Sequence, residues 1–261
     1  MALATERTTF GELLKGWRAR RRLSQLELAS DAAVSTRHLS FLETGRARPS
    51  REMVLHLAEQ LDVPLRERNA LLEAAGFSRA YGERPLDAPE LAPAREALDL
   101  VLASHEPYPA IVVDRWWELV AANSAIGLFI EGMPEDLLEP PINVVRASMH
   151  PDGLAGRIEN FEEYAAHLVG RLRRQVELTA DPRLAALLTE VRGYPGVVEV
   201  PDFEPRGAAL LPMLLRSDDG TTLSFFSTIA TFGTPTDVTL EELAIETFFP
   251  ADQVTRDAFT R

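Results

Sequence analysis

Residues 23–50 of the chain read LSQLELASDAAVSTRHLSFLETGRARPS, and their pattern predicts how the amino-terminal part folds. Ser24 and Glu27 have the spacing of a capping box, in which the serine caps a helix and the glutamate reaches back to the serine backbone. Ser35 is a good N-cap for a second helix that runs through Leu42. The stretch therefore predicts two short helices joined by a tight turn.

Helical patterns on both sides of this stretch predict three more helices, because apolar side chains recur three and four residues apart. Gly76 is placed to end the last of them. We therefore expect an all-α, five-helix domain over residues 1–76. The residues that support the flanking helices are Phe10, Leu13, Leu14 and Trp17, then Met53, Val54, Leu57, Ala58 and Leu61, then the run from Leu65 to Ala75.

The remainder begins with residues 77–94, which contain three prolines and no clear period and which we interpret as a linker. Residues 95–261 mix helical and strand patterns and predict an α+β domain with an antiparallel sheet. The SDDG at 217–220 between two apolar runs is typical of a hairpin. The predicted strands are IVVD (111–114), WWELVAAN (116–123), ALLPMLLR (209–216), TTLSFFSTIATF (221–232) and LEELAIETFF (240–249), and long helices are expected over 161–176 and 182–192.

The net charge of −13 is unevenly distributed along the chain. Residues 1–80 hold 13 basic and 10 acidic side chains, whereas the rest holds 14 basic and 30 acidic ones. Affinity for nucleic acid depends on the cations that face the phosphates rather than on whole-chain charge. The acidic balance therefore does not exclude a nucleic-acid partner for the amino-terminal domain.

Several function classes are disfavoured by simple absences in the sequence. There is no cysteine, which excludes disulfides and thiolate metal sites, and we expect no metal site or cofactor. The start MALATERTTF is unlike a signal peptide, and no apolar run is long enough to cross a membrane, so we expect a cytoplasmic protein. No GxSxG, HExxH, GxxxxGK[ST] or GxGxxG motif occurs, and we expect no catalytic residues.

The two short helices have the spacing of a helix-turn-helix, whose second helix enters the major groove of DNA with its amino end leading. Arg37 is the best candidate for base readout, because its planar fork can bind guanine with two hydrogen bonds. The full set of expected base-reading residues is Thr36, Arg37, His38 and Ser40. The expected phosphate contacts are Ser24, Gln25, Arg46, Arg48 and Arg51.

The same stretch resembles the lambda-repressor-like, or Cro/C1-type, helix-turn-helix. Its markers here are Gln25, Ala29, Val34, Ser35, Glu43, Gly45 and Pro49. The resemblance implies a structural charge pair between Arg18 in the first helix and Glu43 at the end of the third. Because one such head makes few base contacts, we expect a homodimer on a palindromic double-stranded operator.

A second resemblance extends over nearly the whole chain. The segments SxRHLSxLExGRxxPSRxMVL (35–55), LRERNALLEAAGF (65–77), HEPYPAIVVDRWWELVAANSA (105–125) and NVVRASMHPDGLAGRI (143–158) are similar to the MmyB-like family of transcription regulators. This resemblance implies a PAS-like second domain, over residues 95–261, that binds a fatty-acid-like or other apolar small molecule.

Candidate ligand residues follow from the expected pocket. Asn143, Arg146 and His150 share one face if their segment is helical, and Arg146 could clamp a carboxylate. Alternatively, Arg146 and His150 brace the HPDG turn, which is the role that we favour. Apolar candidates from the last strands are Met213, Phe225 and Ile229, and core packing is the simpler role for each of them.

Two other functions stay open at this point. The helical head could be a protein-interaction module without a role in DNA binding. The second domain could serve only for dimerisation, with no ligand at all.

Overall fold

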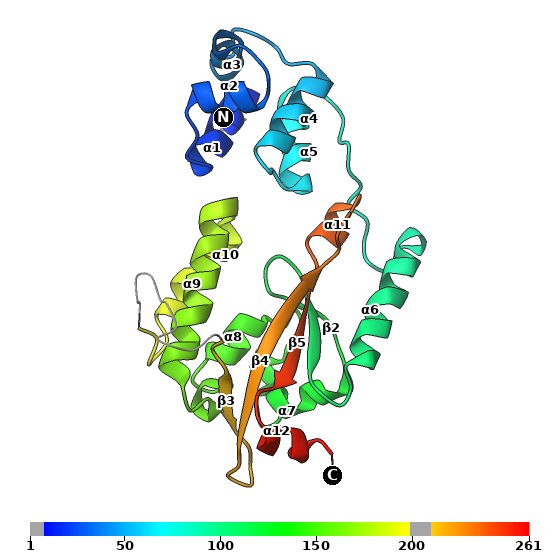
Figure 1. Cartoon of the computed structure of the whole chain (residues 1–261), viewed down its shortest axis with the longest axis vertical. Helices are drawn as coiled ribbons and strands as arrows, with labels where there is room; N and C mark the ends of the chain where they lie inside the picture. Colours follow the sequence, from blue (N-terminus) through cyan, green and yellow to red (C-terminus); the bar gives the residue numbers. More distant parts are fainter. Residues whose placement is uncertain (1–7, 199–209, 261) are drawn as a thin grey trace, which may run out of the picture. The chain divides into compact units, whose positions relative to one another are not determined.

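A computed structural model describes residues 8–198 and 210–260 (Figure 1). The chain forms two compact units, and each unit is made of two separate segments of the sequence. Residues 1–86 together with 234–241 make the first unit, and residues 87–233 with 242–261 make the second. The first unit is therefore completed by a segment from near the end of the chain.

The first unit contains the predicted five-helix domain. Its helices are α1 (Phe10–Arg20), α2 (Gln25–Asp31), α3 (Thr36–Glu43), α4 (Arg51–Gln60) and α5 (Leu65–Ala74). The capping box at Ser24 is present, and the Ser35 hydroxyl accepts from the backbone N–H of His38 at the start of α3. The apolar stripes meet in one core that includes Leu14, Trp17, Leu39, Leu42, Val54 and Leu57.

Half of the segment expected to be a linker packs as part of this unit. The buried side chain of Asn69 in α5 accepts from the backbone N–H groups of Ala80 and Tyr81 and donates to the carbonyl of Tyr81. Residues 77–86 are therefore fixed by hydrogen bonds, which the absence of a periodic pattern could not indicate. Of the three prolines, Pro85 lies in this fixed segment, Pro89 begins a 3-10 turn, and Pro93 lies in the first turn of α6 (Ala92–Ser104).

We call the inserted segment Thr234–Glu241 the strap, because it leaves the sheet of the second unit after one strand and returns at the next. It ends in the short helix α11 (Val238–Glu241), whereas LEELAIETFF was predicted to be strand from residue 240. That prediction is wrong at its start, because Glu241 ends a helical turn and the strand begins only at Ala244. The leucines and glutamates at 240–243 fit a helical turn as well as a strand.

The strap is held by hydrogen bonds to the end of the helical domain. The N–H of Val238 donates to the carbonyl of Gly82 at 2.8 Å, and Arg84 pairs with the buried Asp237 at 2.8 Å. Val238 itself is fully buried. Helix α5 begins without a side-chain cap from its own N-cap residue, and a Glu241 carboxylate oxygen accepts from the N–H of Leu65 at 2.6 Å. The strap therefore supplies an acceptor for the first backbone N–H of α5, which the Pro64 side chain cannot do.

The second unit is built on a five-stranded antiparallel sheet in the order β2-β1-β5-β4-β3, as described in residues 87–198 and 210–260. This confirms the expected α+β, PAS-like domain. The strands are β1 (Ala110–Val113), β2 (Leu119–Ala122), β3 (Met213–Arg216), β4 (Thr222–Thr231) and β5 (Ala244–Pro250). The helices are α6, α7 (Gly127–Ile130), α8 (Val144–Met149), α9 (Phe161–Thr179), α10 (Pro182–Arg192) and α12 (Gln253–Ala258), with 3-10 turns at Pro89–Leu91, Ser124–Ile126, Glu135–Leu137 and Ala155–Arg157.

Two predicted strands are shorter than expected. ALLPMLLR forms a strand only from Met213, and its first residue, 209, lies outside the described part of the chain. WWELVAAN is strand only from Leu119, because Asp114 accepts from the N–H groups of Trp116 and Glu118 and so forms a turn.

Figure 1 shows α6 on one side of the sheet and α8, α9 and α10 on the other. Successive strand residues point to opposite faces, so Phe248 of β5 joins the core beneath α8–α10 while Phe249 packs edge-on against His105 after α6. The face that carries Phe248 is the one that encloses the cavity described below.

Candidate DNA-binding surface and ligand cavity

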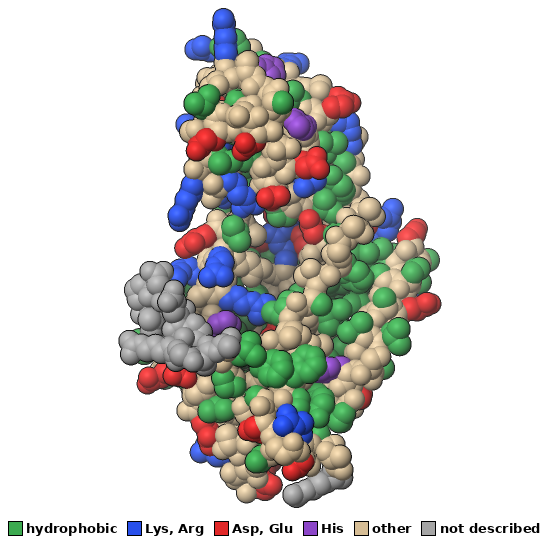
Figure 2. Space-filling view, in the orientation of Figure 1, with side chains coloured by type: hydrophobic (Ala, Val, Ile, Leu, Met, Phe, Trp, Pro, Cys, Tyr) green, Lys and Arg blue, Asp and Glu red, His purple; other side chains and the backbone are tan. Residues whose placement is uncertain are grey.

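One face of helix α3 packs in the core of the first unit, and the opposite face is accessible. Leu39 and Leu42 are buried in the core, whereas Thr36 and Arg37 at its amino end are exposed. His38 and Ser40 are half-buried. Figure 2 shows basic side chains gathered over the end of the unit where α2 and α3 lie. The four residues predicted to read bases therefore lie on the leading end and the exposed flank of one helix.

An aromatic ring organises two of the arginines on this surface. The guanidinium of Arg37 lies 5.2 Å from the centre of the Phe41 ring, and that of Arg46 lies 6.0 Å from the same ring. Such cation–π contacts restrict the side chains while leaving their N–H donors available. Phe41, which sequence reasoning left out of the site, thus positions one predicted base contact and one predicted phosphate contact.

The other predicted phosphate contacts differ in how they are held. Arg48 is exposed, whereas Arg51 donates to the carbonyl of Ser78 at 2.6 Å. The Ser24 hydroxyl caps α2, and the Gln25 amide donates to Glu43 at 2.7 Å. Gln25 therefore has a structural partner inside the unit in addition to its predicted contact with phosphate.

The charge pair implied by resemblance is present. Arg18 Nε donates to one oxygen of Glu43 at 2.6 Å and Nη2 to the other at 2.9 Å, and the Glu43 side chain is only 2% exposed. Burial opposes ionisation of Glu43, but the hydrogen bonds from Arg18 and Gln25 and the charge of Arg18 outweigh it and lower the pKa of Glu43. The pair joins α1 to the carboxyl end of α3 and so orients the candidate recognition helix.

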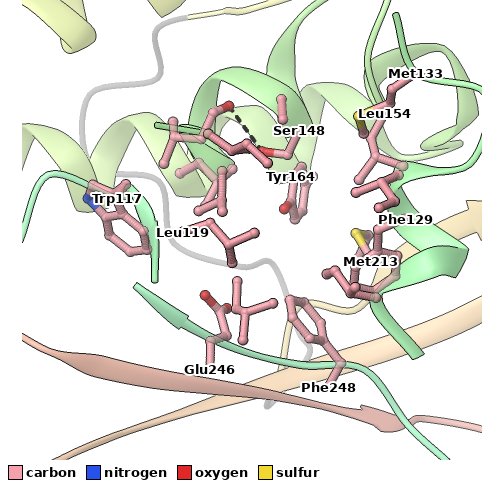
Figure 3. Close-up of a pocket in the computed structure, with 18 residues that line it drawn as sticks. Trp117, Leu119, Phe129, Met133, Ser148, Leu154, Tyr164, Met213, Glu246 and Phe248 are labelled. Atoms are coloured by element: carbon pink, nitrogen blue, oxygen red, sulfur yellow. Dashed lines mark hydrogen bonds between the residues drawn. The ribbon is translucent and has the colours of Figure 1, made fainter. Parts of the chain in front are cut away.

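The second unit encloses an apolar cavity between the sheet and helices α7, α8 and α9 (Figure 3). About 680 Å³ of empty space lies inside it and at its mouth, part of which is open to solvent. Most of the lining is aliphatic or aromatic. The lining residues include Ile111, Trp117, Leu119, Phe129, Met133, Leu154, Leu168, Met213 and Phe248.

Three polar side chains interrupt this lining: Ser148 from α8, Tyr164 from α9 and Glu246 from β5. The Ser148 hydroxyl donates to the carbonyl of Val145 at 3.1 Å. Burial, followed by the negative charge of Glu246, raises the pKa of Tyr164, so the phenol keeps its proton at neutral pH. An apolar cavity with a few convergent polar groups is the usual form of a ligand site.

Comparison with known proteins shows which protein families resemble the parts of the chain that carry these two sites. A model of the helix-turn-helix domain matches residues 9–71. A model described as the MmyB-like transcription regulator ligand binding domain matches residues 94–261. The chain belongs to the MmyB-like transcription regulators. Together the two matches indicate a ligand-responsive, DNA-binding regulator, and neither description names an enzyme.

The other comparisons give little further information about this MmyB-like regulator. A search of curated proteins gave no match. One matching solved structure, described as "Structure of an RNA-binding Light-Oxygen-Voltage Receptor", is 15% identical, with a TM-score of 0.28, over 98% of this chain and 67% of that chain. Within residues 8–198 and 210–260, no helix has the length and apolar character needed to cross a membrane.

The residues predicted to contact ligand in the MmyB-like regulator are not all at the cavity. Met213 lines it, and Phe225 lines an adjoining smaller hollow. Ile229 is 41% exposed on β4 and lines neither space. In the sheet it pairs with Glu246, which does line the cavity.

Asn143, Arg146 and His150 lie away from the cavity and make structural contacts. Asn143 caps α8, and Arg146 forms a two-pronged ion pair with Glu190 at 2.6 and 2.8 Å. His150 packs edge-on against the ring of Tyr194, whose pKa is raised to about 12 by burial and by its hydrogen bond to Glu190. His150 also accepts from the backbone N–H of Asp152 at 3.1 Å and so braces the HPDG turn as favoured, whereas Arg146 is fixed against α10 rather than against that turn.

Sequence reasoning missed Tyr164 and Glu246, although one signal was available. Glu246 interrupts the apolar run AIETFF two residues before Phe248, so both side chains must share a face of β5. A carboxylate on the core-facing side of a strand is unusual and indicates a functional or paired group.

A further missed residue is Gly11, which lets α1 and α3 approach closely. A Cβ at this position would lie 2.4 Å from the carbonyl oxygen of Glu43 and 2.8 Å from that of Leu42. We expect Gly11→Ala to lower the free energy of unfolding by about 1–3 kcal/mol, since backbone must move to relieve the overlap. Thermal unfolding of the full chain measures this effect.

The same helix offers a matched control for that substitution. A Cβ on Gly16 would meet nothing within 4 Å, and its position is helical. We expect Gly16→Ala to stabilise the protein by roughly 0.5–1 kcal/mol. Equal effects of the two substitutions would contradict a special role for Gly11.

Proposed function

We propose that this MmyB-like regulator binds a palindromic DNA operator as a homodimer and that an apolar small molecule in its second unit changes its affinity for that operator. The observation that carries the proposal is the combination in one chain of a helix-turn-helix with an exposed cationic leading end and an enclosed apolar cavity. A fatty-acid-like chain suits the aliphatic lining. The proposed function requires no metal or redox cofactor, and we propose a cytoplasmic location.

The roles on the DNA follow from the helix geometry. Arg37 would bind a guanine edge in the major groove, with Thr36, His38 and Ser40 beside it. Ser24, Gln25, Arg46, Arg48 and Arg51 would contact phosphates and set the register of the helix. We propose a dimer because two heads about one helical turn apart would read enough bases for a specific site.

In this proposal the effect of ligand binding is transmitted to the helical unit through the strap. Strand β5, which follows the strap, carries Glu246 and Phe248 in the cavity wall. The strap itself is part of the first unit and caps α5 through Glu241. We infer that a ligand which shifts β5 alters how α5 is held, and through α5 the helix-turn-helix.

The role of Arg37 is tested by binding of the full chain to its operator and to variants with single base changes. We expect Arg37→Ala to weaken operator binding by about 1–3 kcal/mol, or roughly 5- to 150-fold, and to relax specificity at one position of each half-site. Fluorescence anisotropy with labelled duplexes measures both quantities.

Arg48→Ala is the comparison variant, because a phosphate contact carries no base information. It should weaken binding to all duplexes alike and reduce the slope of log affinity against log salt by about 1. Unchanged sequence preference in Arg37→Ala would refute its base-reading role. Binding to a protein partner that DNA does not compete for would instead favour the protein-interaction alternative.

A further inference from the structure

The wall of the ligand cavity carries a negative charge. Glu246 is the charged member of the cavity lining within the described residues, and its side chain is 12% exposed. Figure 3 shows its carboxylate directed from β5 toward the interior of the cavity. A ligand in this cavity must therefore accommodate a carboxylate that the protein supplies.

The partners of Glu246 lie beside the cavity rather than across it. Ser227 on β4 donates to Glu246 at 2.6 Å, and Arg171 Nη1 lies 4.0 Å from the same carboxylate oxygen. Arg171 stacks over the Trp117 ring at 4.3 Å and lines the adjoining hollow, but it does not line the main cavity. Arg171 therefore faces Glu246 from the adjoining hollow, which shares Tyr164, Glu246 and Phe248 with the main cavity.

The other polar groups of the main cavity present no positive charge. Ser148 donates its proton to the carbonyl of Val145, and its side chain also hydrogen-bonds the Tyr164 phenol. Tyr164 is neutral at physiological pH, because burial and Glu246 raise the pKa of its phenol. A ligand carboxylate would therefore meet Glu246 without a cation inside the main cavity, and like charges brought together away from water repel strongly.

We propose that the cavity selects amphiphiles whose head group donates hydrogen bonds, with a primary alcohol as the simplest case, over carboxylates of the same chain length. The hydrocarbon chain packs along the aliphatic lining, and the hydroxyl donates to Glu246. This inference rests on the proposed ligand-responsive function and narrows its ligand from any fatty-acid-like molecule to one with a donor head group.

Titration of the full-length protein with decan-1-ol and decanoate at pH 7 tests the proposal. Binding is read from native mass spectrometry and from thermal shift. We expect decan-1-ol to bind roughly tenfold more tightly than decanoate or better, since a difference of about one hydrogen bond to a charged group is of this size.

A pair of variants locates the selectivity. Glu246→Gln removes the negative charge, and we expect decanoate to bind more tightly so that the two affinities come within roughly threefold of one another. Glu177→Gln, an exposed position on α9, is the matched control and should leave the ratio unchanged. An unchanged ratio in Glu246→Gln would show that another group sets the preference and would overturn the assignment.

Other outcomes separate this inference from the function on which it rests. Tighter binding of decanoate by the wild-type protein would overturn the head-group preference and leave ligand binding intact. Binding of neither molecule would overturn both. The wild-type comparison needs no variant, so a misfolded Glu246→Gln protein leaves the proposal open to refutation.

Discussion

Replacement of Glu43 by glutamine is expected to lower the free energy of unfolding of the helical unit by about 3 kcal/mol, because it leaves the half-buried Arg18 guanidinium without a counter-charge. The lost stability affects the candidate recognition helix, since Glu43 is the last residue of α3 and Arg18 lies in α1. Gln25, which also donates to Glu43, would lose the charge of its acceptor.

Chemical denaturation of the full chain, with hydrogen exchange to assign the loss to α1 and α3, measures this effect. Glu59→Gln is the control, since that side chain is exposed on α4. In the cycle with Arg18→Met, the double variant should lose less stability than the two single variants together, because neither buried charge is then left alone. Additive losses would refute the coupling.

The pH dependence of the stability of the same unit gives an independent test of the Glu43 contribution. Because the pKa of Glu43 is lower in the folded protein than in the unfolded chain, its contribution is fully present above the ordinary glutamate value of about 4.3. The contribution is lost as pH falls through the folded-state value, when the carboxylate accepts a proton. Glu43→Gln should therefore show a shallower loss of stability in acid than the wild-type protein.

The helix-turn-helix could be predicted from sequence because its signals are local. Ser24, Ser35 and Gly45 mark helix ends within a few residues of the groups that they satisfy. Arg18 and Glu43 are separated by 25 residues, and only the resemblance to a known helix-turn-helix implied their pairing. Local capping and turn residues thus predicted the helices, and the resemblance to a known family predicted one contact between them.

The cavity and the strap could not be predicted in this way, because they depend on register and on distant contacts. Ile229 and Glu246 are paired across β4 and β5, yet only Glu246 reaches the cavity, because the exposed half of β4 extends beyond it. The contact between Leu65 and Glu241 spans 176 residues of sequence. No periodic pattern in either segment indicates such a partner.

Substitutions in the strap are expected to separate ligand binding from its effect on DNA. In Glu241→Ala the N–H of Leu65 loses its acceptor, and in Val238→Ala a fully buried side chain is shortened. Neither residue lines the cavity. We therefore expect both variants to bind ligand with near wild-type affinity while the ligand-dependent change in operator affinity, typically about 5- to 150-fold in allosteric proteins, falls to less than about twofold.

The experiment compares operator affinity with and without a saturating ligand in each variant. Thr236→Ala is the matched control, because Thr236 is an exposed residue of the same strap. A normal ligand response in Glu241→Ala and Val238→Ala would show that the signal travels elsewhere, for example through residues 77–86. Because coupling between two sites is reciprocal, the strap variants should also abolish any effect of operator DNA on ligand affinity. That second measurement distinguishes lost coupling from general weakening of the DNA-binding unit, which would lower operator affinity equally with and without ligand.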